Sequence, residues 1–215
     1  MMQSEVFSVC KKRIIFIFVF ILLLLLFVFF LKGTIEDKTF CIVLDPGHGG
    51  EDPGAVSGEI YEKNINLSVA LLVCEQLQKY ENVVVKMTRD DDNFISLSER
   101  ADIANTQGAD LFVSIHANSL DDTSYAGVIT FYHPKKFSSK RPAEIIQRNI
   151  CSATNAINRN VRSENYAVLR ETRMPAVLVE TGFMTCPEEL TNLINPEYQY
   201  FLALGISEGI IEYIN

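Results

Sequence analysis

Five short apolar segments, spaced between residues 40 and 180 and separated by longer amphipathic stretches, limit the folds open to this chain. The segments are rich in β-branched residues and mostly apolar on both faces, which is typical of buried strands. They are FCIVLD (40–45), NVVVKMT (82–88), DLFVSIH (110–116), GVITFY (127–132) and AVLVE (176–180). Strands separated by helices of this length predict an α/β fold, a single three-layer domain with a mostly parallel sheet between helices.

Helix signals fill the gaps between these segments. Residues 64–80 repeat apolar side chains at helical spacing. Ser96 and Glu99 can form a capping box for a second helix that ends before Gly108. These two helices are therefore expected on the surfaces of the sheet.

Two prolines mark later helices. Pro142 can open one helix at its first position, and the last helix is expected to begin at Asn195-Pro196. In that last helix Gly205 and Gly209 would allow close packing against a neighbour.

Ionisable residues stand at the ends of three predicted strands. His48 follows the first strand within IVLDPGHGGEDPG (42–54), His116 ends the third, and Glu180 ends the fifth. In α/β sheets ligands bind beyond the carboxyl ends of the strands, so these groups are expected to share one rim. A phosphate loop is disfavoured, because the glycine-rich loop lacks a G-x-x-x-x-G-K-[ST] match and has Asp52 where G-x-G-x-x-G needs glycine.

A zinc ion fits these histidines and carboxylates, since catalytic zinc takes three His or carboxylate ligands and leaves one coordination position open. His48 and His116 are the first candidates. The residues leave the third ligand open between His133 and a carboxylate such as Glu62, which stands at the start of the first helix. His133 lies in a polar loop typical of a solvated histidine, and Glu62 could instead offset the helix dipole.

Other polar residues at the rim have two interpretations each. Asp45 and Asn118 could orient a ligand from behind or simply shape the chain. Glu180 could take a proton from a metal-activated water and return it to a leaving amine. It could also form a structural ion pair with one of three arginines, which are Arg89, Arg170 and Arg173. Short zinc motifs such as H-E-x-x-H are absent.

The amino-terminal region carries an uninterrupted apolar run over residues 14–31. A helix of this length nearly matches the hydrocarbon core of a bilayer, about 30 Å thick. Lys11, Lys12 and Arg13 precede the run, so residues 1–13 are expected in the cytoplasm and the rest outside. We expect an uncleaved anchor, a linker over 32–39 and a domain over 40–215, with a cleaved signal peptide as the alternative.

Charge and cysteine content exclude other classes. The chain has 19 Lys and Arg against 27 Asp and Glu, a net charge of −8, which disfavours nucleic acid as a partner. No C-x-x-C spacing occurs among the five cysteines. Cys41 and Cys74 lie in apolar segments and are expected to be buried thiols rather than a disulfide.

Five ordered blocks carry a resemblance to a known family. They are IVLDPGHGGEDPGA, YEKNINLSVA, MTRDDDNFISLSERADIAN, LFVSIHAN and RMPAVLVETGFMT. In order and spacing the chain resembles the zinc-dependent N-acetylmuramoyl-L-alanine amidases of bacterial cell walls over residues 40–214.

The resemblance implies one catalytic zinc ion held by His48, Glu62 and His116, with Glu180 as the general base. It implies hydrolysis of the amide between N-acetylmuramic acid and L-alanine in peptidoglycan. Cys186 departs from the family, which often has asparagine at that place. The short anchor without a wall-binding module is similar to amidases that act in spore cortex maturation and germination, which would place the domain between the forespore membranes.

Two alternatives remain at this point. The first is a membrane-tethered, non-catalytic protein that binds peptidoglycan or a partner and retains the amidase fold. An activating or positioning protein partner is also compatible with the missing wall-binding module. The second alternative, a polysaccharide deacetylase, would need a closely spaced histidine pair that the chain lacks.

Overall fold

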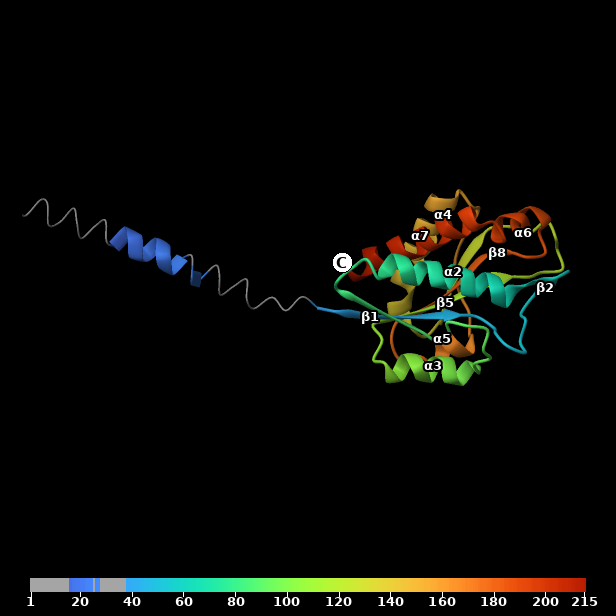
Figure 1. The fold of residues 1–215 in the computed structure, drawn as a ribbon, viewed down its shortest axis with the longest axis horizontal. Coiled ribbons are helices and arrows are strands. Elements are labelled where there is room, and N and C mark those ends of the chain that lie inside the picture. The colour runs from blue at the N-terminus through green and yellow to red at the C-terminus, as the bar shows by residue number, and fades with distance from the viewer. Residues whose placement is uncertain (1–15, 25, 28–37) are drawn as a thin grey trace, which may run out of the picture. The chain divides into compact units, whose positions relative to one another are not determined.

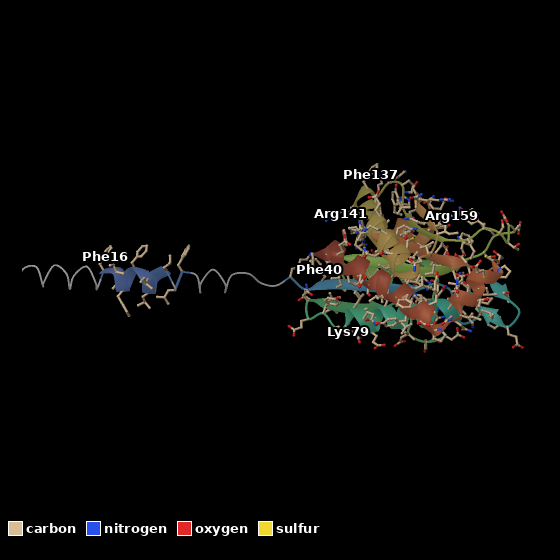
Figure 2. All side chains as sticks on the ribbon, turned by 90° about the horizontal axis from the view of Figure 1, so that it is seen from above. Phe16, Phe40, Lys79, Phe137, Arg141 and Arg159 are labelled. Carbon is tan, nitrogen blue, oxygen red and sulfur yellow. The ribbon has the colours of Figure 1, made fainter. Side chains whose placement is uncertain are left out.

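A computed structural model describes residues 16–24, 26–27 and 38–215. The chain divides into two units, Met1–Lys38 and Thr39–Asn215. In the first unit, residues 16–24 and 26–27 are helical, and their apolar side chains are exposed, Phe16 to 73% (Figure 2). Within the described ranges, no helix has the length and hydropathy required to cross a bilayer. The predicted span 14–31 includes residues outside those ranges, so the anchor stays a prediction.

A six-stranded sheet forms the centre of the second unit, in the order β4-β1-β5-β8-β6-β7. All neighbouring pairs are parallel except β6 and β8, which are antiparallel. The predicted α/β fold with a mostly parallel sheet is therefore confirmed. The strands are β1 (Phe40–Pro46), β4 (Val83–Met87), β5 (Leu111–Asn118), β6 (Val128–Tyr132), β7 (Asn158–Ser163) and β8 (Ala176–Phe183), beside a separate hairpin of β2 (Val56–Ser57) and β3 (Ile60–Tyr61).

Helices cover both faces of the sheet (Figure 1). Helices α2, α4 and α7 pack on one face, where the larger apolar core lies. Helices α3 and α5 cover the other face over a smaller core. The helices are α2 (Glu62–Leu77), α3 (Leu97–Thr106), α4 (Lys140–Thr154), α5 (Ala167–Glu171), α6 (Pro187–Leu193) and α7 (Pro196–Ile214), with a 3-10 turn at Phe137–Ser139.

The predicted helix ends are partly right. Ser96 caps α3, since its Oγ accepts the amide of Glu99 at 3.3 Å, and Asn195 caps α7 as expected. Helix α2 begins at Glu62, two residues before the predicted start. The prediction for Pro142 is wrong, because α4 begins at Lys140 and Pro142 occupies its third position. Proline is tolerated there because the first helical amides have no acceptor within the helix.

Five short elements were not predicted from the sequence, and each omission has a physical reason. Strand β7 reads NRNVRS, which is polar because it is an edge strand with mostly exposed side chains. The hairpin β2–β3 and helices α5 and α6 are too short to establish a periodic apolar pattern. These elements surround the carboxyl end of the sheet or form its edge. Because they were not predicted, the predicted rim was incomplete.

The cysteines agree with the prediction for Cys41 and Cys74. Both are free thiols, half-buried against the apolar cores. Burial raises the pKa of each thiol, that of Cys41 with help from the charge of Asp110. Neither cysteine belongs to the group of possible metal ligands found among the described residues.

Candidate metal centre

The glycine-rich loop after β1 presents His48 at the carboxyl end of the sheet. His48 has a φ of 61°, a left-handed conformation that is uncommon for a residue with a side chain. Gly47 is required for another reason, since a Cβ built there would lie 2.1 Å from Cε1 of His116. The ring of His116 thus packs directly on the backbone of Gly47. The two imidazole centroids are 5.0 Å apart in an edge-to-face arrangement.

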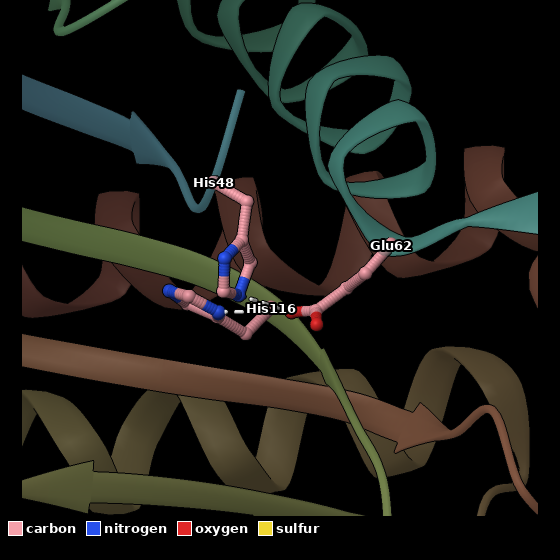
Figure 3. Close-up of side chains that lie close together, drawn as sticks. All are labelled: His48, Glu62 and His116. Atoms are coloured by element: carbon pink, nitrogen blue, oxygen red, sulfur yellow. Dashed lines mark hydrogen bonds and ion pairs between the residues drawn. The ribbon is translucent and has the colours of Figure 1, made fainter. Parts of the chain in front are cut away.

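Glu62, at the start of α2, extends its carboxylate toward both of these rings (Figure 3). Its Oε1 lies 2.9 Å from Nδ1 of His116 and 3.3 Å from Nε2 of His48. Its Oε2 accepts the amide of Ala55 at 2.9 Å, which fixes the carboxylate plane. Among the described residues, these three ligand atoms form a group within 4.8 Å of one another. Two imidazoles and one carboxylate that converge on one point fit a zinc ion with an open position.

The charges of the three residues are mutually dependent. Burial alone would lower the pKa of His48, but the hydrogen bond and charge of Glu62, with those of Asp52, raise it to about 9. Burial alone would raise the pKa of Glu62, whereas its contacts with His116 and His48 bring it well below its usual range. Without a metal, a proton on His48 therefore supplies the positive charge that the buried carboxylate requires.

Asp52 supports His48 from the side opposite Glu62. Its Oδ2 lies 2.7 Å from Nδ1 of His48, and its Oδ1 accepts the amide of Gly54. A carboxylate on one imidazole nitrogen orients the ring and directs the other nitrogen to a metal. In the sequence, Asp52 was considered only as a residue that disfavours phosphate binding, and its contact with His48 was not predicted. The four-residue spacing between His48 and Asp52 was the signal that could have indicated this contact.

Glu180 lies beside His116, because the two residues are paired in the register of β5 and β8. Its side chain is buried, and Oε2 has no hydrogen-bond partner within the described part of the chain. Burial raises the pKa of Glu180 to about 7. None of Arg89, Arg170 and Arg173 pairs with it in the described residues, so the structural ion pair considered from the sequence does not form.

A cavity of about 440 Å³ is lined by His48 and His116 and by Glu180. Apolar side chains form much of its wall, including Phe94, Ile95, Leu97, Tyr166 and Val168. The ring of Tyr166 packs edge-to-face against Phe131, with centroids 5.4 Å apart. These wall residues were not predicted as part of the site, because they lie in the loop before α3, at its first position, and in or just before the short α5.

His133 and Asn118 lie apart from the centre. His133 is buried rather than solvated, so that interpretation is wrong, and its ring bonds Oδ1 of Asn165 at 3.1 Å. The ring also accepts the amide of Lys135, which explains its burial without a metal. The Oδ1 of Asn118 accepts the amide of Ser119, and this local contact shapes the chain after β5.

Comparison with known proteins adds to this geometry. Residues 42–212 match the family described as N-acetylmuramoyl-L-alanine amidase, Amidase_3. The germination-specific N-acetylmuramoyl-L-alanine amidase of Bacillus subtilis (strain 168) is 33% identical over 187 residues, covering 80% of this chain and 78% of the relative. A crystal structure of N-acetylmuramoyl-L-alanine amidase from Clostridium difficile 630 is 39% identical, with a TM-score of 0.81 over 82% of this chain and 97% of that one. The CwlD amidase from Clostridioides difficile, solved in complex with the GerS lipoprotein, is 32% identical, with a TM-score of 0.78 over 82% and 98%.

Proposed function

This chain belongs to the N-acetylmuramoyl-L-alanine amidase family, zinc-dependent enzymes that act on peptidoglycan, and from that premise we propose roles for its individual residues. His48, Glu62 and His116 hold the zinc ion, and Glu180 is the general base. The observation that carries this proposal is the unpartnered Oε2 of Glu180, buried in the cavity that the two histidines line.

The donor set supports zinc. Zinc bound by two imidazoles and a carboxylate polarises a carbonyl group and lowers the pKa of a water molecule toward about 7. Glu62 sits on a helix and His116 on a central strand, so two of the three ligands come from rigid elements. Asp52 and the amide of Ala55 orient His48 and Glu62 from outside.

Glu180 performs the proton transfers. As a carboxylate it accepts a proton from the attacking water, and as an acid it gives that proton to the departing nitrogen of L-alanine. A pKa of about 7 serves both steps, because the group then gains and loses its proton with little free-energy cost near neutral pH. Its position opposite His116 in the sheet supports this role, because both residues line the same cavity.

The test of this role is Glu180→Gln. Glutamine keeps the shape of the side chain but cannot accept the proton, so turnover should fall about 100- to 10,000-fold while zinc affinity stays unchanged. Glu188→Gln is the matched control, because Glu188 is exposed on α6. Zinc content and release of L-alanine amines from peptidoglycan are measured for each. A Glu180→Gln enzyme with nearly full turnover would exclude the role.

The products separate this activity from the alternatives. The zinc-loaded chain is incubated with purified peptidoglycan, and new ends are identified by mass spectrometry. New L-alanine amines are expected, whereas new glucosamine amines would indicate a deacetylase. No product from the zinc-loaded chain would favour the non-catalytic binding protein or a requirement for an activating partner.

We further infer a place for the enzyme in the cell. The germination-specific relative supports a role in germination. Together with the family resemblance of the sequence, it leads us to infer a role in spore cortex maturation through formation of muramic-δ-lactam. Residues 1–13 would lie in the cytoplasm, 14–31 would anchor the chain, 32–39 would link, and 40–215 would form the catalytic domain outside the membrane. In a spore former, a deletion strain should lose muramic-δ-lactam from its cortex, and unchanged cortex muropeptides would contradict this role.

A protein partner is also compatible with the comparisons. The CwlD amidase was solved with a lipoprotein, and a similar extracytoplasmic partner could activate or position this chain. Full turnover by the isolated zinc-loaded chain would show that activation by a partner is not required.

A further inference from the structure

Two buried arginines donate hydrogen bonds to the backbone of the glycine-rich loop. Arg100 of α3 donates from Nη1 to the carbonyl of Pro46 and from Nη2 to that of His48, each at 2.7 Å. Arg89, which follows β4, donates from Nε to Pro46 at 3.0 Å and from Nη2 to Gly47 at 2.9 Å. Three consecutive carbonyls of the loop are therefore bound by guanidinium groups.

Asp45 anchors this arrangement at the end of β1. Its fully buried carboxylate accepts from Nη1 of Arg100 at 2.8 Å. The hydroxyls of Thr88 and Ser114 complete its hydrogen bonds, each at 2.7 Å. Asp45 thus fixes Arg100, and Arg100 fixes the carbonyl of His48. The sequence left open whether Asp45 orients a ligand or turns the chain, and these contacts connect it to His48 through one side chain.

Arg89 joins the loop to the segment that carries the second ligand. Its Nη2 also donates to the carbonyl of Lys63 at 2.9 Å, and Lys63 directly follows Glu62. One guanidinium nitrogen therefore bridges the backbones beside His48 and beside Glu62. Lysine could not make this set of contacts, because its donors share a single nitrogen whereas arginine offers a rigid planar fork.

Stability alone does not account for two buried arginines. Their side chains are 4% and 3% exposed, and desolvated charges carry a large penalty that apolar packing would avoid. Burial and the charge of Arg100 together lower the pKa of Arg89, so the pair is also mutually repulsive. The loop that they hold includes His48 in its left-handed conformation, which is unfavourable for a residue with a side chain.

We propose that Arg89 and Arg100, the second of them fixed by Asp45, are positioning residues that preform the metal centre by holding residues 46–48 in the conformation that presents His48. This inference rests on the proposed role of His48 as a zinc ligand. His48 is the ligand that needs such support, because it lies on a loop whereas Glu62 and His116 belong to a helix and a strand.

The test compares Arg100→Lys and Arg89→Lys with Arg148→Lys in the full-length chain. Arg148 is an exposed arginine that pairs with Glu212 on the surface, so it controls for the exchange itself. Zinc affinity is measured by competition with a chelator, and the geometry of the site by the absorption spectrum of bound Co²⁺. Both buried variants should bind zinc about 10- to 100-fold more weakly, as is typical when groups that orient ligands are lost, and should alter the cobalt spectrum. Arg148→Lys should match the wild type.

Denaturant unfolding of the zinc-free proteins separates positioning from bulk stability. Reduced stability with wild-type zinc affinity and an unchanged cobalt spectrum would overturn the proposal. If the arginine variants do not fold, Thr88→Val decides in the same way, since it removes one hydrogen bond from Asp45 and should give a smaller loss of zinc affinity. If the wild type binds zinc no better than His48→Ala, the proposed metal site fails, and this inference fails with it.

Discussion

Gly47 shows how a single absent side chain shapes the metal centre. Its backbone φ lies outside the left-handed region, so the glycine is needed for space and not for conformation. The ring of His116 occupies the place where a Cβ would be. Gly54 has a similar role, because a Cβ there would lie 2.6 Å from Oε2 of Glu62. The glycines around His48 thus allow ligands from distant segments to approach one another.

Gly47→Ala should therefore displace the His116 ring and weaken zinc binding and turnover together. The expected loss of zinc affinity is at least about tenfold, the lower end of the range for groups that orient a ligand. Chelator competition and the rate of L-alanine amine release provide the measurements. Gly58→Ala is the contrast, since its φ of +61° makes alanine strained but nothing lies within 4 Å of the new Cβ. Gly58→Ala should lower stability but leave zinc affinity and turnover unchanged. Unchanged zinc affinity and turnover in Gly47→Ala would contradict the proposal that the His116 ring needs the space at Gly47.

The proton on His48 makes zinc binding depend on pH. The pKa of His48 is raised to about 9 in the metal-free protein, so at pH 7 the ring is protonated and must lose its proton to bind a metal. Zinc affinity should rise from pH 6 to pH 9 and level off above the pKa. Calorimetry in buffers of different ionisation enthalpy should show release of about one proton per zinc at pH 7. Release of far less than one proton per zinc at pH 7 would show that His48 is not protonated in the metal-free protein.

Among the elements, α4 and α7 pack closely through two glycines, as the sequence predicted. A Cβ at Gly205 would lie 2.6 Å from Cα of Ile150, and one at Gly209 would lie 2.8 Å from Cα of Ile146. The obstructing atoms are backbone atoms, which cannot move as a flexible side chain can. The two helices would have to separate to admit either methyl group.

Gly205→Ala should consequently destabilise the fold. Alanine gains about 1 kcal/mol in helix propensity, but overpacking typically costs about 1–3 kcal/mol, so a net loss is expected. Urea unfolding measures the difference, with Glu208→Ala on the exposed face of α7 as the control. An increase in stability for Gly205→Ala would mean that the helices can separate without cost.

Periodicity predicted the elements that are long or buried on both faces. Strands β1, β5 and β8 were recognised because their apolar runs are continuous, and their neighbouring positions bring His48, His116 and Glu180 to one rim. Helix α5 and the loop before α3, which line the cavity, have no periodic pattern. Their positions depend on contacts with the sheet, which local sequence does not reveal.

For the whole molecule, the division at Lys38 separates the apolar amino-terminal segment from the catalytic unit. The second unit contains every residue of the candidate metal centre and the complete sheet. Its core includes side chains from all three layers, so it is expected to fold without the first unit.

Deletion of residues 1–38 should release an active, zinc-binding domain from the membrane fraction. Fractionation of cells that express the two forms, followed by blotting and an amidase assay, tests this expectation. The full-length chain should sediment with membranes and the shortened one should not. Recovery of a mature full-length product that begins near residue 33 would instead support the cleaved signal peptide.

The residue pattern was enough to predict the α/β class, the rim that collects His48, His116 and Glu180, and the exclusion of a phosphate loop. These follow from short-range periodicity and from the general rule that parallel strands meet at their carboxyl ends. The family resemblance added Glu62, which local spacing left undecided.

The hydrogen bonds that support the metal centre could be identified only in the folded structure. The contacts of Arg89 and Arg100 with residues 46–48 join segments about 40 to 55 residues apart in the chain, and the acceptors are backbone carbonyls, which every residue possesses. The amino-acid sequence therefore does not show which carbonyl accepts a hydrogen bond from a given arginine. The support of His48 therefore becomes visible only when the chain is folded and each hydrogen bond can be assigned to its partner.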